Sequence, residues 1–299
     1  MHRFFVPPEL LKTIKIDIPL PKDLAHQVRD VLRLNTGEQL LLLDNSGDEI
    51  LATVTKTNKA TVEVHLLERR PGRSEPAIGI ILCQGLLKST RFEWILEKGT
   101  ELGVSVFSPI ICRRSMAGLE DTGSSKIQRW QRIIQEAAEQ SGRSRLPELL
   151  PIRPLMDALS DISPDTLAIM PWEVEHSLTL HDVLNSTNRF SENVGATLAV
   201  ARPPHDVLST SSPPAGNVGA ILAVARSITP ETTSNLSMPA SQSPSTIVLF
   251  IGPEGGLMAE EVAQAQRHGV QVVTLGTRIL RAETAAITTV ANVMYELER

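Results

Sequence analysis

Two glycine-bearing turns, each placed between a strand and a helix, constrain the fold of this chain more than any other feature. Residues 246–251 form a β-branched and aromatic run about as long as a buried strand, and the turn 252–256 follows it. Residues 270–275 form a second apolar run, which ends at the turn 276–281. Residues 282–298 then predict a long amphipathic helix. This order predicts two βα units side by side in a parallel sheet, with both turns at the carboxyl ends of the strands.

The spacing of apolar residues predicts which faces of these helices are buried. In the first helix Val262 and Ala265 are expected to point inward, and Gly269 is expected to end it. Met258 stands where a capping Ser or Thr is usual, which weakens this helix start. The final helix is expected to bury a stripe made of Ile287, Val290, Ala291, Met294 and Leu297.

The turns themselves allow two interpretations. Ligands of parallel sheets bind outside the carboxyl ends of the strands, where freed backbone groups could hold a polar, adenine-bearing ligand without any charged side chain. Tight connections alone would use the same residues. The pattern is neither a Walker loop nor a Gly-x-Gly-x-x-Gly fingerprint, because the required Lys and glycine spacing are missing.

Similar elements precede these units along the chain. A helix is expected to be capped by Ser124 or Ser125 and ended by Gly142, and the strand that ends at Pro171 leads into another loop. The remaining elements predicted for this part are strands at 77–83, 105–111 and 167–170 and a helix at 88–102.

The first part of the chain predicts a small β domain. Alternation at 14–18 and 61–66 and the apolar run 39–43 predict strands, and one helix is expected at 22–34. Proline and charge at 71–76 mark a linker. The predicted domains are therefore 1–72 and 76–299.

Composition and charge narrow the class of protein. A length of 299 residues with 41% hydrophobic and 21% charged residues is typical of a globular chain with a sizeable core. Aromatic residues make up only 3%, which argues against RNA binding through many stacked rings. Residues 1–153 hold 22 Lys and Arg against 19 Asp and Glu, whereas residues 154–299 hold 7 against 15. The net charge of −5 by itself argues against a nucleic-acid partner, but its uneven distribution permits a first half that faces RNA.

Cysteine usage and the apolar runs bear on compartment. Cys83 and Cys112 form no paired motif, which predicts reduced core thiols and no metal site. The start of the chain lacks an apolar signal core, and no run reaches membrane-spanning length. We therefore expect a cytoplasmic protein without a membrane partner.

Several strings then point to a known family. Gly252-Pro253-Glu254-Gly255-Gly256, followed by the string 275–285, resembles the RsmE family of S-adenosylmethionine-dependent methyltransferases of small-subunit ribosomal RNA, within the SPOUT superfamily. Further similar strings cover both predicted domains in the expected order, at 2–5, 29–33, 91–95, 98–104 and 136–143.

The resemblance implies an α/β fold with a C-terminal trefoil-knotted SPOUT parallel-sheet domain and an N-terminal PUA-like β-barrel domain that grips RNA. The knot loops would be 170–173, 252–257 and 275–281, with backbone groups that read the adenine of S-adenosylmethionine and apolar walls from Leu275, Ile279 and Leu280. The implied cofactor-binding residues are Met170, Pro171, Gly252, Pro253, Glu254, Gly255, Gly256, Leu275, Gly276, Ile279, Leu280, Arg281, Ala282, Thr284 and Ala285.

The resemblance also implies the reaction, which is methylation at N3 of a uridine in 16S ribosomal RNA by a homodimer. That nitrogen must lose a proton, and Arg281 and Glu283 are the candidate catalytic residues. Glu254 is a third candidate, although it could instead satisfy backbone amides before the following helix. Glu283 could equally serve as a favourable charge in a first helical turn.

Basic residues at the ends and edges of elements are candidates for RNA binding, although single arginines there often only complement a helix dipole or keep the surface soluble. The candidates are Arg3, Arg29, Arg33, Lys88, Arg91, Lys98, Arg113, Arg114 and Arg143.

The segment 188–245 departs from the family pattern. It is rich in Ser and Pro and poor in charge, and the decamer 193–202 returns at 217–226 with nine of ten positions matched. We interpret it as a flexible insertion, and a docking arm for a partner is the alternative.

Two other functions stay open at this stage. The methyl group could go to a ribose 2′-hydroxyl, or the chain could be an RNA-binding assembly factor that does not transfer methyl groups.

Overall fold

The computed structural model describes residues 1–12, 17–116, 118, 123–163, 166–186 and 246–298. These residues form two compact units that interleave along the chain. Unit 1 comprises Met1–Pro76, Glu93–Ser105 and Thr122–Glu148, and unit 2 comprises Ala77–Phe92, Val106–Asp121 and Leu149–Arg299. The predicted domains 1–72 and 76–299 are continuous segments, and their boundaries stay a prediction. The predicted insertion at 188–245 and the strand start at 14–16 lie outside the described residues.

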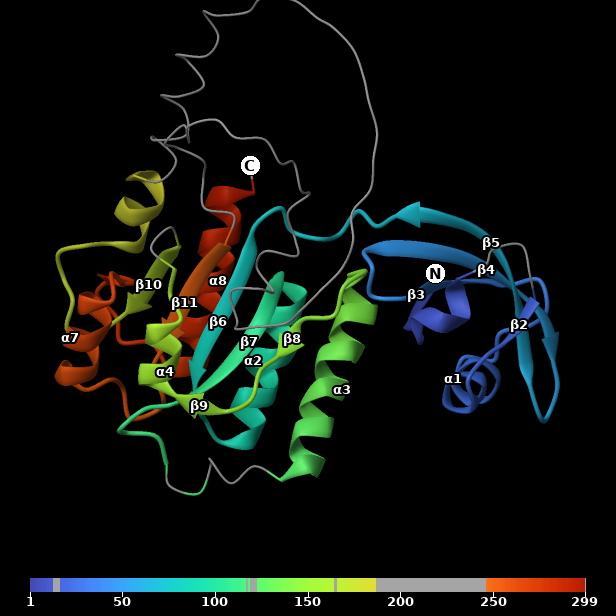
Figure 1. Cartoon of the computed structure of the whole chain (residues 1–299), viewed down its shortest axis with the longest axis horizontal. Coiled ribbons are helices and arrows are strands. Elements are labelled where there is room, and N and C mark those ends of the chain that lie inside the picture. Colours follow the sequence, from blue (N-terminus) through green and yellow to red (C-terminus); the bar gives the residue numbers. More distant parts are fainter. Residues whose placement is uncertain (13–16, 117, 119–122, 164–165, 187–245, 299) are drawn as a thin grey trace, which may run out of the picture. The chain divides into compact units, whose positions relative to one another are not determined.

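Unit 1 contains a five-stranded sheet in the order β1-β3-β4-β5-β2 (Figure 1). β1 pairs in parallel with β3, and the other neighbours pair antiparallel. The predicted strands at 39–43 and 61–66 are confirmed, although the second runs on to Pro71. β4 was missed, even though its buried residues Ile50, Ala52 and Val54 alternate as a strand requires. The strands are β1 (His2–Phe5), β2 (Asp17–Pro19), β3 (Gln39–Leu43), β4 (Asp48–Thr57) and β5 (Val62–Pro71).

The predicted helix at 22–34 is shorter and less regular than expected. It consists of α1 (Lys22–His26) and the π-helical turn η2 (Gln27–Val31), preceded in the chain by the 3-10 turn η1 (Pro8–Leu11). Arg33, with φ of 55°, lies in the left-handed region and cannot continue a right-handed helix. The predicted inward residues Ala25 and Val28 are buried.

The long helix α3 (Ser124–Ser141) belongs to unit 1. Its N-cap is Gly123, so the prediction that Ser124 or Ser125 caps it is wrong, because both serines already lie inside the first turn. Trp130 is fully buried on its apolar stripe. Gly142 ends the helix with φ of 84°, as predicted, and this left-handed turn favours glycine.

Unit 2 is built on a sheet in the order β12-β10-β11-β6-β7-β8, with β9 paired to β7 (Figure 1). The prediction that the two C-terminal βα units lie side by side is wrong, because β10 pairs in parallel with both β11 and β12 and separates them. As a result, three loops leave the same edge of the sheet. The strands are β6 (Gly79–Gly85), β7 (Val104–Ile111), β8 (Glu148–Leu149), β9 (Arg153–Pro154), β10 (Leu167–Pro171), β11 (Thr246–Ile251) and β12 (Gln271–Val273).

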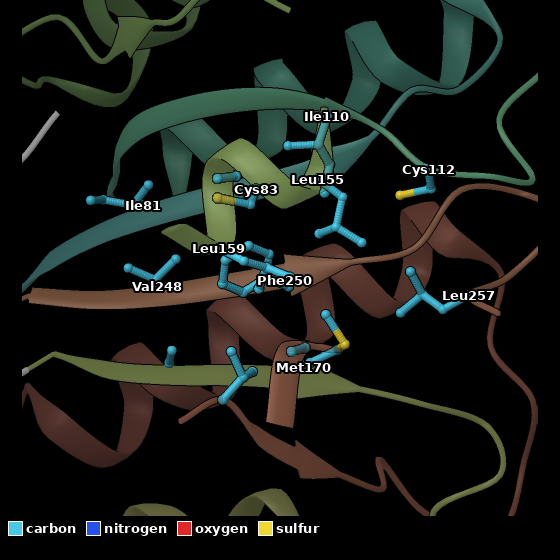
Figure 2. Close-up of a cluster of buried hydrophobic side chains, with 14 of the residues drawn as sticks. Ile81, Cys83, Ile110, Cys112, Leu155, Leu159, Met170, Val248, Phe250 and Leu257 are labelled. Atoms are coloured by element: carbon cyan, nitrogen blue, oxygen red, sulfur yellow. The ribbon is translucent and has the colours of Figure 1, made fainter. Parts of the chain in front are cut away.

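Helices cover both faces of this sheet. Figure 2 shows β-strand side chains such as Cys83, Phe250 and Met170 packed together with Leu155 and Leu159 of α4, and buried residues of α7 join the same cluster. α8 contacts β11 and β6, whose alternate residues point away from that cluster. The helices are α2 (Ser89–Glu101), α4 (Leu155–Ser160), α7 (Ala259–Arg267) and α8 (Ala282–Leu297), and residues 180–186 are also helical.

The buried stripe of α8 differs from the predicted one. Val290 and Met294 are buried as expected, but Ile287, Ala291 and Leu297 are only half-buried. The helix is apolar on more than one side, so its sequence did not single out one face. The residues that are buried are Ala286, Thr289, Val290, Val293 and Met294.

Both cysteines are free and buried, as the sequence predicted. Burial raises the pKa of the Cys83 thiol to about 12, and burial also raises the pKa of Cys112, which lies near Glu261. Because the thiolate is the reactive form, neither side chain is suited to act as a nucleophile at neutral pH. Among the described residues there is no group of three or more potential metal ligands, and no helix is long and apolar enough to cross a bilayer.

Candidate functional site

A pocket of about 410 Å³ lies at the carboxyl edge of the unit 2 sheet. Three segments that are distant in sequence line it: the loop that begins at Pro171, the turn 251–257 and the loop 274–282. They follow β10, β11 and β12, and they meet because β10 lies between the other two strands. The volume is within the range of about 300–1,000 Å³ that is usual for small-molecule sites.

The turn after β11 packs closely against its surroundings. Gly85, at the end of β6, leaves no room for a side chain, because a Cβ there would lie 2.5 Å from the nitrogen of Pro253. Gly256 has φ of 73°, a conformation that favours glycine. The sequence around this turn therefore sets its shape through glycine on both sides of the contact.

The carboxylate of Glu261 fixes the start of α7. It accepts hydrogen bonds from the backbone nitrogens of Met258 (2.8 Å) and Arg113 (2.8 Å). This replaces the missing Ser or Thr cap, because Glu261 satisfies the N–H of the N-cap residue. The alternative role considered for Glu254 was to satisfy backbone amides before this helix. Glu261 satisfies the amide of Met258, and the described hydrogen bond of the Glu254 side chain is to Arg91.

The loop after β12 is more open. Gly276 has φ of 111°, its nitrogen donates to Oγ1 of Thr274 (3.2 Å), and a Cβ added to it would have no neighbour within 4 Å. Leu275 and Leu280 are half-buried in the pocket wall, whereas the side chain of Ile279 is 85% exposed. Of the three predicted apolar walls, Ile279 thus presents its side chain to solvent.

Most of the residues predicted to bind a cofactor line this pocket. Met170 does not, because its side chain is buried in the core cluster of Figure 2. Thr284 is exposed on α8 and is also absent from the lining. The predicted residues that do line it are Pro171, Gly252, Pro253, Glu254, Gly255, Gly256, Leu275, Gly276, Ile279, Leu280, Arg281, Ala282 and Ala285.

The lining also includes residues outside the list of predicted cofactor-binding residues. Trp172 and Glu173 come directly after β10 and belong to the predicted knot loop 170–173, which the pocket confirms as part of its wall. His176 and Ile251 carried no comparable signal, because only the folded loop brings His176 back to the pocket.

The charged candidates form one group beside the pocket. Arg91, in the first turn of α2, lies with Nη1 2.7 Å from Oε1 of Glu254 and with Nε 3.6 Å from Oε1 of Glu283. The other carboxylate oxygen of Glu283, Oε2, is buried and has no hydrogen-bond partner among the described residues. Arg281 is exposed and lines the pocket.

The candidate RNA-binding residues fall into different classes. Arg143 is only 3% exposed and donates to the carbonyl oxygen of Val104 (2.6 Å) and to Glu75 (3.0 Å), so its assignment to RNA binding is wrong. Lys98 contacts Glu97 and Glu101, both at 2.8 Å, and these bonds raise its pKa.

Other cations of the set are also engaged within the protein. Arg29 donates to Asp30, which lowers the pKa of that carboxyl to about 2, and also to the carbonyl oxygen of Asn58. Arg3 lies 3.8 Å from Glu49. The cations of the set whose side chains have no hydrogen bond or ion pair with the described residues are Arg33, Lys88 and Arg113.

A family model described as an RNA methyltransferase domain matches residues 74–198 and 216–294, which is more than half of the chain. The chain belongs to this RNA methyltransferase family. A second model, described as an RNA methyltransferase PUA domain, matches residues 21–67 of this RNA methyltransferase. Together they confirm the predicted family and an α/β fold with an N-terminal PUA-like β domain and a C-terminal parallel-sheet methyltransferase domain.

Relatives of this RNA methyltransferase carry consistent names. It is 26% identical over 302 residues to a ribosomal RNA small subunit methyltransferase E of Bacillus subtilis, covering 100% of this chain and 98% of that one. It is 30% identical over 298 residues to the protein of that name from Synechocystis, covering 99% and 78%. A crystal structure of such an enzyme from Neisseria gonorrhoeae, bound to S-adenosyl methionine, is similar with a TM-score of 0.73, 25% identity and 99% and 97% coverage.

Proposed function

We propose that this protein transfers a methyl group from S-adenosylmethionine to N3 of a uridine in the ribosomal RNA of the small subunit. The observation that carries the proposal is the single pocket formed by the loops after β10, β11 and β12 in a chain of the RNA methyltransferase family. The names of the relatives support small-subunit ribosomal RNA as the substrate. The choice of N3 rests on the resemblance noted in the sequence.

The residues of the pocket fit S-adenosylmethionine. When bound, this cofactor supplies a methyl group that is activated by its positive sulfur. The glycine turns bring backbone donors and acceptors to the pocket wall, as an adenine requires, and Leu275, Leu280 and Leu257 add apolar surface. A side chain at Gly255 would clash with Arg114, whose Cβ would lie 2.9 Å from the added Cβ. From this fit we assign to the cofactor the predicted cofactor-binding residues that line the pocket.

Methylation at N3 requires that the nitrogen lose its proton, so the chain must offer that proton an acceptor. Arg91 lies against one oxygen of each carboxylate, at 2.7 Å for Glu254 and at 3.6 Å for Glu283, so Glu254 is the more tightly held of the two. The second oxygen of Glu283, Oε2, has no hydrogen-bond partner among the described residues. We infer that Glu283 is the better proton acceptor and that the exposed Arg281 stabilises negative charge on the uracil. Arg281 lines the pocket, and Glu283 comes directly after the lining residue Ala282 in the first turn of α8.

The product of the reaction tests this proposal. Incubation of the protein with labelled S-adenosylmethionine and unmodified small-subunit RNA is expected to place one label on a uridine base. Mass spectrometry of the digested RNA identifies the methylated atom. Label on a ribose would favour 2′-hydroxyl transfer, and a protein that binds RNA and cofactor without any transfer of label would contradict an enzymatic function.

We also infer a homodimer with a trefoil knot at the pocket, as the resemblance implies. Exposed apolar side chains around the pocket loops support the dimer, because Val174 is 57% and Ile279 85% exposed. Light scattering coupled to size exclusion is expected to give twice the monomer mass, and Ile279→Lys is expected to shift the mass toward the monomer. A monomeric wild-type protein across the micromolar range would contradict the dimer.

A substrate in the ribosome also implies a cytoplasmic location.

A further inference from the structure

Segments outside the turn 252–256 hold most of its residues individually. At its start, Nε2 of Gln84 lies 3.3 Å from the carbonyl oxygen of Gly252 and donates to it. Gly85 then packs directly under Pro253, as its lack of space for a Cβ shows. The end of β6 therefore supports the first two residues of the turn.

Arg91, which lies in α2, holds Glu254, the third residue of the turn. Its guanidinium donates to Oε1 of Glu254 at 2.7 Å, and its Nε lies 3.6 Å from Oε1 of Glu283 in the first turn of α8. The side chains of Glu254 and Glu283 are only 21% and 15% exposed. One guanidinium thus joins the turn after β11 to the helix that follows the loop after β12.

Arg114, which lies in the loop after β7, holds Gly255, the fourth residue of the turn. Its Nη1 donates to the carbonyl oxygen of Gly255 at 3.1 Å, and its own carbonyl oxygen would lie 3.0 Å from a Cβ at that position. Glu173 closes the last residue, because a Cβ on Gly256 would meet its Oε1 at 2.8 Å. The glycines of this turn are what allow these neighbours to approach.

We propose that Arg91 and Arg114 are positioning residues of the turn 252–256 and not contacts to RNA phosphates. This inference rests on the proposed function, because it assigns the turn to S-adenosylmethionine. A turn with three glycines loses much conformational entropy when it is ordered, because glycine is the most flexible residue of the unfolded chain. The contacts of Arg91 and Arg114 order the turn before the cofactor binds, so less conformational entropy is lost on binding. Donors engaged with Glu254 and Gly255 are also less available to phosphate.

The chain offers a matched control for each arginine. Lys88 precedes α2 and Arg113 directly precedes Arg114; both are exposed candidates for RNA binding, and neither side chain contacts the turn through a described hydrogen bond or ion pair. Calorimetric titration with S-adenosylmethionine is expected to show about five- to tenfold weaker binding for Arg91→Ala and for Arg114→Ala. For Lys88→Ala and Arg113→Ala the change is expected to stay within about twofold, because tenfold corresponds to about 1.4 kcal/mol and these side chains contribute no such contact.

Two further measurements separate positioning from general stability. Arg91 acts in part through Glu254, so the losses of cofactor affinity in Arg91→Ala and in Glu254→Gln are expected to add up to more than the loss in the double variant. Arg91→Lys keeps a charge near Glu254 and is expected to bind between the wild type and Arg91→Ala, which preserves the test where the alanine variant loses stability. RNA affinity at saturating cofactor is expected to fall more for Lys88→Ala and Arg113→Ala than for Arg91→Ala and Arg114→Ala.

The outcomes are distinct. If Arg91→Ala and Arg114→Ala bind the cofactor like the wild type but lose RNA affinity, they are phosphate contacts and the inference is wrong. If the wild-type protein itself takes up no S-adenosylmethionine, the proposed function fails before the variants are compared. If the wild-type protein binds S-adenosylmethionine and Arg91→Ala and Arg114→Ala bind it with the same affinity, only the positioning role is overturned.

Discussion

Replacing Gly255 by valine is expected to weaken the binding of S-adenosylmethionine by about a hundredfold while the fold survives. A Cβ at this position would lie 2.9 Å from Cβ and 3.0 Å from the carbonyl oxygen of Arg114, and valine adds two more methyl groups. Overpacking of this kind usually costs about 1–3 kcal/mol. A hundredfold loss of affinity corresponds to about 2.8 kcal/mol, the upper part of that range. Calorimetric titration measures the affinity, and thermal unfolding monitors the fold.

The cost should fall on the turn and not on the core. Gly255 is exposed and its φ lies outside the left-handed region, so the variant is limited by space beside Arg114 and not by backbone conformation. Gly255→Ala and Gly123→Ala form a matched pair, because a Cβ at Gly123 would meet nothing within 4 Å. We expect the first to weaken binding and the second to leave it within about twofold. Wild-type affinity in Gly255→Val would contradict the assignment of this turn to the cofactor.

The pocket was largely predictable because its signals are local. Each turn is a short string directly after an apolar run, and the rule for parallel sheets places both at one edge. The order of the strands was not predictable in the same way. Nothing in residues 246–275 indicates that β10, some 75 residues earlier, inserts between the two strands that they form. Side-by-side pairing was the simplest interpretation of that segment, and long-range pairing overrode it.

The charged residues show where local signals end. An arginine after an element has the same appearance whether it faces solvent, pairs with a carboxylate or is buried, because its partners lie far away in the sequence. Arg91 meets Glu254 across 163 residues, and Arg114 meets Gly255 across 141. The start of α7 could not be predicted locally either, since Glu261 fixes it from within the helix while Met258 occupies the N-cap.

Arg143→Ala is expected to destabilise the protein by about 3–5 kcal/mol, because it breaks a buried ion pair and its hydrogen bonds. The Arg143 side chain donates from Nη1 to the carbonyl oxygens of Val104 (2.6 Å) and Thr100 (3.3 Å), and from Nη2 to Oε2 of Glu75 (3.0 Å). The other oxygen of Glu75 accepts from the backbone nitrogen of Ser144 (2.8 Å). Urea unfolding of the variant measures the loss.

The variant series for Arg143 distinguishes a structural cation from an RNA contact. Arg132 is a suitable control, because its side chain is 80% exposed and its partner among the described residues is Glu136 on the same helix. Arg132→Ala should therefore change stability by at most about 0.5 kcal/mol. The double variant Arg143→Met/Glu75→Gln removes both charges and is expected to recover part of the loss, because no uncompensated charge remains buried. Gly142 turns the chain so that Arg143 enters unit 1, where a phosphate cannot reach it. An Arg143→Ala protein of wild-type stability that has lost RNA affinity would therefore contradict this account.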